Sequence, residues 1–256
     1  MYDYIDTSVT DGVARIELNR PNQFNALNRV MVKEIVSTLT MYDRDDEVRV
    51  LMLTGKGRAF SAGADIDEMV SETPISLELL NQFADWDQFA SLKKPLIGAV
   101  HGYVFGGGFE LALCCDLLIA AEGTTFAFPE VNLGVMPGAG GTQRLTKLIG
   151  RTRALRWLLT GERMAVDEAK ACGIVIDVVH PEALESEAHK YATTLAAKPP
   201  LSLRMIKDAV NYAVDVPLRE GMGYERKNFY ALFASEDQTE GMCAFVDKRT
   251  PQFKGK

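Results

Sequence analysis

The pattern of apolar and polar positions along the chain predicts alternating strands and helices. Residues 13–18 alternate apolar and polar side chains, as a strand with one buried face does. Shorter and more continuously apolar runs predict four further strands, at 48–53, 96–100, 117–120 and 174–178. Glycine, proline and polar residues lie between these runs and mark the connecting loops.

Helical spacing of apolar residues accounts for most of the remaining chain. Asn28 can cap a helix that runs to about Tyr42 with its apolar residues on one face. Further helices are predicted at 76–91, 107–114, 142–149, 151–160 and 165–171, and the pattern from about 181 to 244 is helical almost throughout. Alternating strands and helices followed by helices predict an α/β fold, with a core at 1–195 and a C-terminal helical region at 196–256.

Composition and charge narrow the class of protein. The 256 residues are 47% apolar and 25% charged, as in an ordinary globular protein, and the net charge of −7 argues against a nucleic-acid partner. The four cysteines form no CxxC pair, so we expect reduced, mostly buried thiols in a cytoplasmic protein, and no metal site. No secretory signal is visible, and the longest apolar stretch, 111–121, is too short to cross a bilayer, so we expect no membrane partner.

Glycine is concentrated in the middle of the chain, where ten of the 21 glycines lie within residues 98–141. The segment 106–110, Gly-Gly-Gly-Phe-Glu, follows a predicted strand and enters a predicted helix. The segment 60–66, Phe-Ser-Ala-Gly-Ala-Asp-Ile, also consists mainly of small residues. Each segment can be a tight turn, or each can expose backbone amides that together form an oxyanion hole.

Two glutamates lie among apolar neighbours, Glu110 near the start of the 107–114 helix and Glu130 in the sequence Phe-Pro-Glu-Val. Desolvation raises the pKa of such a carboxyl, and two in one dry pocket can divide the roles of acid and base. Since 20 residues separate them, only the fold can bring them together. The alternatives are that Glu110 stabilises a helix dipole and that Glu130 pairs with a nearby cation.

A third glycine-rich segment, residues 133–145, leads into a helix that Thr142 is expected to cap. The chain contains neither the HExxH motif of zinc peptidases nor the GxSxG motif of serine hydrolases. Its chemistry is therefore expected from the glycine-rich segments and the two glutamates.

In this order, the segments resemble the crotonase superfamily, and within it the enoyl-CoA hydratases. The resemblance covers essentially the whole chain. It is carried by Asn-Arg-Pro at 19–21, Asn-Ala-Leu-Asn at 25–28, Ala-Gly-Ala-Asp-Ile at 62–66, Gly-Gly-Gly-Phe-Glu at 106–110, Pro-Glu at 129–130, Pro-Gly-Ala-Gly-Gly-Thr-Gln-Arg at 137–144 and Asp-Lys-Arg-Thr-Pro-Gln-Phe at 247–253. It implies a crotonase-type spiral of repeated strand-strand-helix turns with a C-terminal helical trimerisation region. The implied assembly is a homotrimer, or a hexamer made of two trimers.

The resemblance also implies functional residues. The amides of Ala64 and Gly107 would form the oxyanion hole, Glu110 would activate water for attack at C3, Glu130 would protonate C2, and the Gly138 amide would help to position the water. Residues expected to contact coenzyme A are Ala26, Ala62, Asp65, Ile66, Phe229 and Lys248, the last two reaching a neighbouring subunit's ligand. Residues 69–92 would line or cover the acyl pocket, or simply be core. Coenzyme A is part of the acyl-CoA substrate, so no separate cofactor is implied.

The resemblance implies a hydro-lyase that adds water to 2-enoyl-CoA thioesters to give 3-hydroxyacyl-CoA, and the presence of both glutamates favours it. Hydration needs one group that takes a proton and one that gives a proton, whereas moving a double bond needs a single base. The alternatives are a hydratase for branched or dicarboxyl substrates (methylglutaconyl-CoA type) and an enoyl-CoA isomerase. An RNA-binding protein is disfavoured by the acidic charge, and a non-catalytic trimer by the presence of both glutamates.

Overall fold

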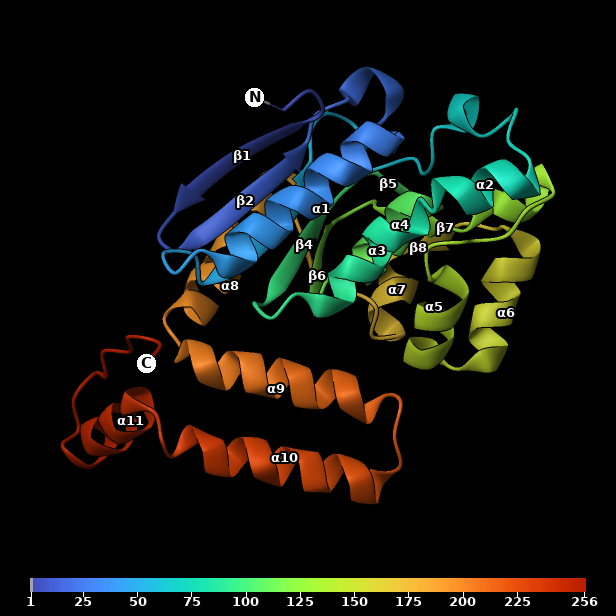
Figure 1. Ribbon diagram of the computed structural model, residues 1–256. Coiled ribbons are helices and arrows are strands. Elements are labelled where there is room, and N and C mark those ends of the chain that lie inside the picture. Colours follow the sequence, from blue (N-terminus) through green and yellow to red (C-terminus); the bar gives the residue numbers. More distant parts are fainter. Residues whose placement is uncertain (1) are drawn as a thin grey trace.

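The computed structural model describes residues 2–256, which form a six-stranded sheet with helices on both faces and a separate group of C-terminal helices (Figure 1). The first two strands are antiparallel and all later neighbours are parallel. In spatial order the strands are β1 (Ile5–Thr10), β2 (Val13–Leu18), β3 (Val50–Gly55), β4 (Leu96–Val100), β6 (Leu117–Ala121) and β9 (Asp177–Val179).

Apolar layers cover both faces of this sheet. On one face α8 (Leu184–Ala196) packs across β2, β3, β4 and β6 through its buried Leu184, Ala188 and Ala192. The other face lies in the larger core, together with the apolar sides of α1 (Arg29–Arg44) and α4 (Gly107–Leu113). Burying one large apolar side chain contributes roughly 1.5–3 kcal/mol, so these two layers hold the sheet in place.

A small second sheet explains how distant segments reach one place. Its strands are β5 (Tyr103–Phe105), β7 (Thr125–Ala127) and β8 (Met164–Ala165). The first two are parallel, with Phe105 opposite Ala127, and the Gly106 amide donates to the Ala127 carbonyl at 2.9 Å. Because parallel strands end at the same edge of a sheet, α4 after β5 and the 3-10 helix η4 (Pro129–Leu133) after β7 begin side by side.

The C-terminal helices α9 (Pro200–Ala213), α10 (Leu218–Leu232) and α11 (Glu236–Val246) extend away from the sheet (Figure 1). Within the described chain no residue of α9 or α10 is buried. One tie to the core is Lys207, whose ammonium group donates to the Asp116 carboxylate at 2.7 Å and to the Lys94 carbonyl at 2.9 Å.

The remaining elements surround the small sheet or connect the strands. They are η1 (Pro21–Gln23), η2 (Ile66–Glu68), α2 (Pro74–Leu80), α3 (Phe83–Asp87), η3 (Gln88–Ser91), α5 (Gly141–Ile149), α6 (Arg151–Thr160), α7 (Val166–Ala171) and η5 (Pro181–Ala183).

Several predictions from the sequence pattern need correction. The single helix at 76–91 is wrong, because Asn81 adopts a left-handed conformation (φ 44°) that ends α2 and separates it from α3. The strand expected at 174–178 forms later, as β9, although Ile174 and Val175 are buried. Thr142 does not cap α5, which begins at Gly141 after Gly140 (φ 107°) without a side-chain cap. The cysteines, expected to be mostly buried, are half-buried at Cys114, Cys115 and Cys172 and exposed at Cys243.

Other expectations are confirmed. Asn28 caps α1, with its side chain accepting a hydrogen bond from the Met31 amide at 2.8 Å. Glu110 lies in the first turn of α4. The predicted strand at 13–18 is β2, and the helix at 151–160 is α6.

Candidate active site

Two glycine-rich segments come into contact at the start of α4. A methyl group on Gly107 would lie 3.5 Å from the Ala64 amide nitrogen, and one on Gly63 would lie 3.0 Å from the Phe105 carbonyl oxygen. Gly63 (φ 108°) and Gly106 (φ 50°) both adopt backbone conformations that favour glycine. Glycine is therefore favoured at positions 63 and 106, where the two backbone segments approach each other.

This approach leaves two peptide N–H groups next to each other without acceptors. Within residues 2–256 neither the Ala64 amide nor the Gly107 amide donates a hydrogen bond. Leu27 pairs with the flanking groups instead, donating to the Gly63 carbonyl at 2.7 Å and accepting from the Asp65 amide at 3.0 Å. Two preorganised amides of this kind can hold an oxygen atom on which negative charge develops.

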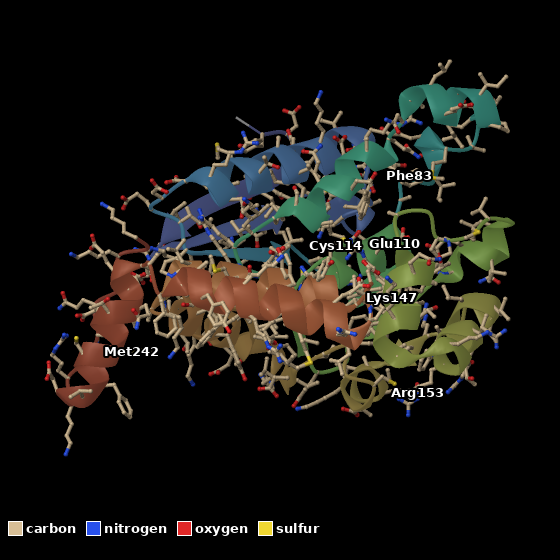
Figure 2. All side chains as sticks on the ribbon, turned by 60° about the horizontal axis from the view of Figure 1, so that its bottom comes forward. Phe83, Glu110, Cys114, Lys147, Arg153 and Met242 are labelled. Carbon is tan, nitrogen blue, oxygen red and sulfur yellow. The ribbon has the colours of Figure 1, made fainter. Side chains whose placement is uncertain are left out.

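Glu110 is held in place by the backbone that precedes α5. Its Oε1 accepts hydrogen bonds from the Ala139 amide at 2.7 Å and the Gly141 amide at 2.8 Å, and the residue is 4% exposed. Burial raises the pKa of Glu110, while these two amides and the positive charge of Arg144 oppose the increase. Figure 2 shows Glu110 inside the molecule, far from Met242 on α11.

Glu130 reaches the same place from η4. A methyl group on Gly106 would lie 3.0 Å from its Oε1, so the carboxyl group faces the start of α4. Its Oε2 is buried and has no hydrogen-bond partner among the described residues. Burial raises the pKa of Glu130 to about 7; the negative charge of Glu110 adds to the increase, and Glu130's own backbone amide opposes it.

The two carboxyl groups thus have different environments within one site. Glu110 is anchored by two amides that favour its charged form, whereas Glu130 has a desolvated oxygen without a donor. Different environments let one carboxyl act as a base while the other holds a proton near neutral pH. The arrangement is capable of proton transfer on both sides of a bond held next to the two amides.

Gly138 lies one residue before the Ala139 amide that binds Glu110. A methyl group there would come within 2.8 Å of the Phe83 ring, so the absence of a side chain admits this ring against the backbone next to Ala139. The expected role of the Gly138 amide in positioning water stays a prediction.

Of the residues expected to contact coenzyme A, four lie beside the paired amides. Ala62 donates from its amide to the Phe24 carbonyl at 2.9 Å, and the Asp65 carboxylate forms an ion pair with Arg20 at 2.5 Å. Ala26 precedes Leu27, which pairs with residues 63–65, and Ile66 follows Asp65 and is 46% exposed.

The other two residues expected to contact coenzyme A belong to the C-terminal helices and are not brought to the glutamates of the same chain. Phe229, on α10, is 55% exposed, and Lys248 follows α11. Their role stays a prediction.

Sequence reasoning missed the groups that hold this site together. The Ala139 and Gly141 amides, the contact of Phe83 with Gly138 and the ion pair of Arg20 with Asp65 were not anticipated. The sequence did contain a sign of the Ala139 and Gly141 amide contacts. Three glycines within residues 138–141 indicate backbone that can approach another group closely.

Comparison with known proteins adds independent findings. The family described as Enoyl-CoA hydratase/isomerase matches residues 8–256. A probable enoyl-CoA hydratase of Mycobacterium bovis is 45% identical over 252 residues, which are 98% of each chain. The 2,3-dehydroadipyl-CoA hydratase of Escherichia coli is 40% identical over 245 residues, covering 95% of this chain and 96% of the relative.

The fold is similar to solved structures as well. A crystal structure described as enoyl-CoA hydratase subunit I from Geobacillus kaustophilus superposes with a TM-score of 0.98 at 60% identity, covering 100% of this chain and 99% of the other. The expected spiral with C-terminal helices is thereby confirmed. Across residues 2–256, no helix is both long enough and apolar enough to pass through a membrane.

Proposed function

The chain belongs to the enoyl-CoA hydratase/isomerase family, and from this premise we propose that it adds water reversibly across the 2,3 double bond of 2-enoyl-CoA thioesters, using Glu110 and Glu130. The observation that carries the proposal is the convergence of these two buried carboxyls beside the unpaired amides of Ala64 and Gly107. A single base would suffice for isomerisation, whereas two carboxyls suit hydration.

In the proposed reaction the amides of Ala64 and Gly107 donate to the thioester oxygen, which gains negative charge as water attacks. Glu110, whose charged form the Ala139 and Gly141 amides favour, takes a proton from the water whose oxygen bonds to C3. Glu130 gives its proton to C2. Transfer of the proton from Glu110 back to Glu130 then restores the starting state, and the Gly138 amide helps to hold the water.

Coenzyme A enters as part of the substrate, and no further cofactor is needed. We assign its contacts to Ala26, Ala62, Asp65 and Ile66 of the same chain, and to Phe229 and Lys248 of a neighbouring copy. The support is that α9 and α10 bury no residue and leave apolar side chains exposed, as an assembly surface does. A homotrimer or a hexamer of two trimers would cover this surface.

The test is the activity of Glu110→Gln and Glu130→Gln on crotonyl-CoA. Each variant should lose at least about 100-fold in kcat, the usual contribution of a general acid or base, while affinity for the coenzyme A thioester is retained. Glu122→Gln is the matched control, since Glu122 is an exposed glutamate on the turn after β6. Full activity of either site variant would disprove the assigned roles.

A second candidate is a hydratase for dicarboxyl or branched enoyl-CoA substrates. The observation that favours it is the 40% identity to the 2,3-dehydroadipyl-CoA hydratase. Steady-state kinetics on linear, branched and dicarboxyl enoyl-CoA thioesters would distinguish the two, because the true substrate class should have the highest kcat/KM.

A further inference from the structure

The segment of residues 66–87, here termed the acyl-side segment, borders the proposed active site but is weakly held by apolar packing. It comprises η2, α2 and α3, and neither α2 nor α3 contains a buried residue. Val70, Ile75 and Leu79 are 80%, 70% and 82% exposed. Where the segment meets α1, apolar side chains adjoin one another with no space between them large enough for a water molecule; they belong to Leu27, Val32, Ile35, Trp86, Phe89 and Leu111.

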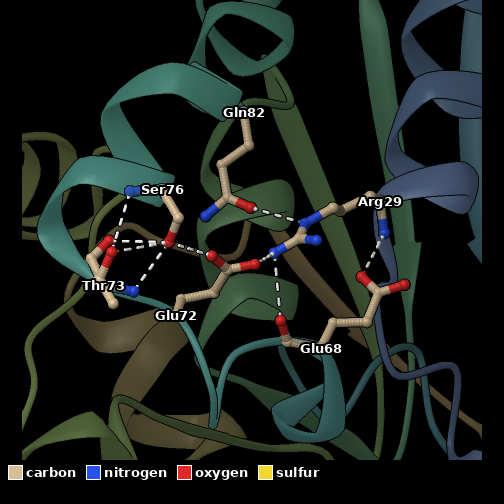
Figure 3. Close-up of polar contacts among 6 residues, drawn as sticks. All are labelled: Arg29, Glu68, Glu72, Thr73, Ser76 and Gln82. Carbon is tan, nitrogen blue, oxygen red and sulfur yellow. Dashed lines mark hydrogen bonds and ion pairs between the residues drawn. The ribbon is translucent and has the colours of Figure 1, made fainter.

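Polar contacts to one arginine hold the segment instead (Figure 3). Arg29, the first residue of α1, forms an ion pair with Glu72, donates from Nη2 to the Glu68 carbonyl at 3.1 Å and donates from Nε to the Gln82 side chain at 3.4 Å. The guanidinium group therefore binds three points spread over residues 68–82. It is the fork geometry of arginine that allows these contacts together.

The ion pair of Arg29 with Glu72 is itself supported. Glu72 also accepts a hydrogen bond from the Ser76 hydroxyl, and these two partners hold the pKa of Glu72 below its usual value. Its side chain is only 14% exposed, against 35% for Arg29. Ser76 in turn belongs to the capping box of α2 with Thr73 (Figure 3), so the contact also fixes the start of that helix.

The acyl-side segment, which Arg29 holds, contacts the backbone that precedes α5 and binds Glu110. Gln82 is followed by Phe83, whose ring occupies the space left by Gly138, one residue from the amide that binds Glu110. Phe83 itself is 41% exposed and lies in a helix without buried residues, so little else fixes its position.

We propose that Arg29 is a positioning residue that sets acyl-chain selection, by holding Phe83 against Gly138 as a wall next to the reacting carbons. The inference rests on the proposed hydratase function. With the wall in place, short 2-enoyl chains fit beside Glu110 and Glu130, and longer chains must displace Phe83. Loss of Arg29 releases the acyl-side segment and lowers that barrier for long chains.

The kinetic test compares crotonyl-CoA with trans-2-decenoyl-CoA. Arg29→Ala should raise the ratio of kcat/KM for the ten-carbon substrate to kcat/KM for the four-carbon substrate about threefold or more. This is the size expected on losing a partly exposed ion pair. The kcat on crotonyl-CoA should change little. Glu72→Gln should shift the ratio in the same direction without altering α1. Arg29→Lys should lie between, because lysine keeps the charge but not the fork.

Matched variants separate this role from a general loss of structure. Lys33→Ala removes another exposed cation from α1, one with no ion pair among the described residues, and should leave the ratio unchanged. Phe83→Ala should raise the ratio by itself. If Arg29 acts through Phe83, the double variant Arg29→Ala/Phe83→Ala should resemble Phe83→Ala rather than add to it.

A readout without substrate tests the same idea. The chain has two tryptophans: Trp157 is 2% exposed, whereas Trp86 is half-buried in the acyl-side segment, so acrylamide quenching of fluorescence reports mainly on Trp86. Arg29→Ala should increase the quenching and Lys33→Ala should not. Unchanged quenching and an unchanged ratio would overturn the proposal, as would an equal loss on both substrates. Wild-type protein inactive on all thioesters would instead refute the proposed function.

Discussion

The catalytic floor of the proposed active site, residues 61–64 and 106–110, and the acyl-side segment, residues 66–87, border the same space but are held by different forces. The floor is fixed by backbone contacts, with Ser61 pairing with Val104 and Gly106 donating to Ala127. The acyl-side segment has no buried residue in its two α-helices and relies on Arg29. The proposed proton transfer is thus assigned to the part of the site that backbone contacts hold, and the proposed acyl selection to the part that one arginine holds.

The largest expected effect is a loss of stability on substitution in the catalytic floor. A methyl group on Gly108 would lie 2.6 Å from both the Cβ and the carbonyl oxygen of Ser61, and backbone cannot shift cheaply there. Gly108→Ala should therefore lower the free energy of unfolding by about 3 kcal/mol, which is the cost of overpacking a core. Chemical denaturation measures the change. A loss below 1 kcal/mol would mean that the floor is as adaptable as the acyl-side segment.

An intermediate effect concerns proton transfer on the floor. Because the pKa of Glu130 is about 7 and the proposed donor is its protonated form, kcat/KM for hydration should fall as pH rises through about 7. Because water addition consumes no net proton, the ratio of the forward to the reverse kcat/KM is fixed at every pH. The reverse dehydration, which uses ionised Glu130 and protonated Glu110, should therefore fall over the same range. Initial rates in both directions between pH 5 and 9 measure the profiles, and a pH-independent hydration rate would contradict the role of Glu130 as acid.

The same raised pKa should affect stability. A carboxyl whose pKa is higher in the folded state than the usual 4.5 binds more protons when folded, so its favourable contribution is lost as pH rises from about 4.5 to 7. At pH 8 the free energy of unfolding of Glu130→Gln should therefore exceed that of the wild type by about 1 kcal/mol or more. At pH 5 the gain should be small. A gain that is equal at both pH values would point to packing rather than to charge.

The smallest expected effect lies on the acyl-side segment. Leu79 is 82% exposed, so Leu79→Ala should change the free energy of unfolding by less than about 0.5 kcal/mol. Thermal and chemical denaturation of the two proteins side by side would measure it. A loss above 1 kcal/mol would mean that α2 is covered in the assembled protein and that the contrast with the floor is weaker than the single chain suggests.

The sequence predicted the parts of this molecule that depend on local pattern. The alternation at 13–18 and the cap at Asn28 have direct local causes, and the family and enzyme class expected from the ordered segments are confirmed by full-length relatives. Apolar spacing alone could not reveal that Asn81 turns left-handed between α2 and α3. The strands β5 and β7 have three residues each, too few to form a readable alternation.

The two glutamate side chains of the candidate site could be predicted from the sequence, but the backbone groups that hold them could not. The two glutamates stood out because carboxyls among apolar residues are unusual, but their meeting depends on the pairing of β5 with β7, which no local pattern encodes. The amides of Ala139 and Gly141 escaped notice because every residue except proline carries such a group. Arg29 resembled any surface cation until its contacts with residues 68–82 were visible.

The unpaired N–H of Ala64 belongs to the main chain, and this limits what side-chain mutagenesis can reveal. Every amino acid except proline presents the same backbone donor at that position. Activities of variants with all other residues at position 64 would therefore report which side chains fit there, and not what the N–H group contributes. Replacing the single amide bond before residue 64 with an ester, by semisynthesis, would remove the donor, and it would also weaken the Gly63 carbonyl as an acceptor from Leu27. The contribution of the Ala64 backbone donor to kcat would then be measurable, although no amino-acid substitution other than proline can remove it.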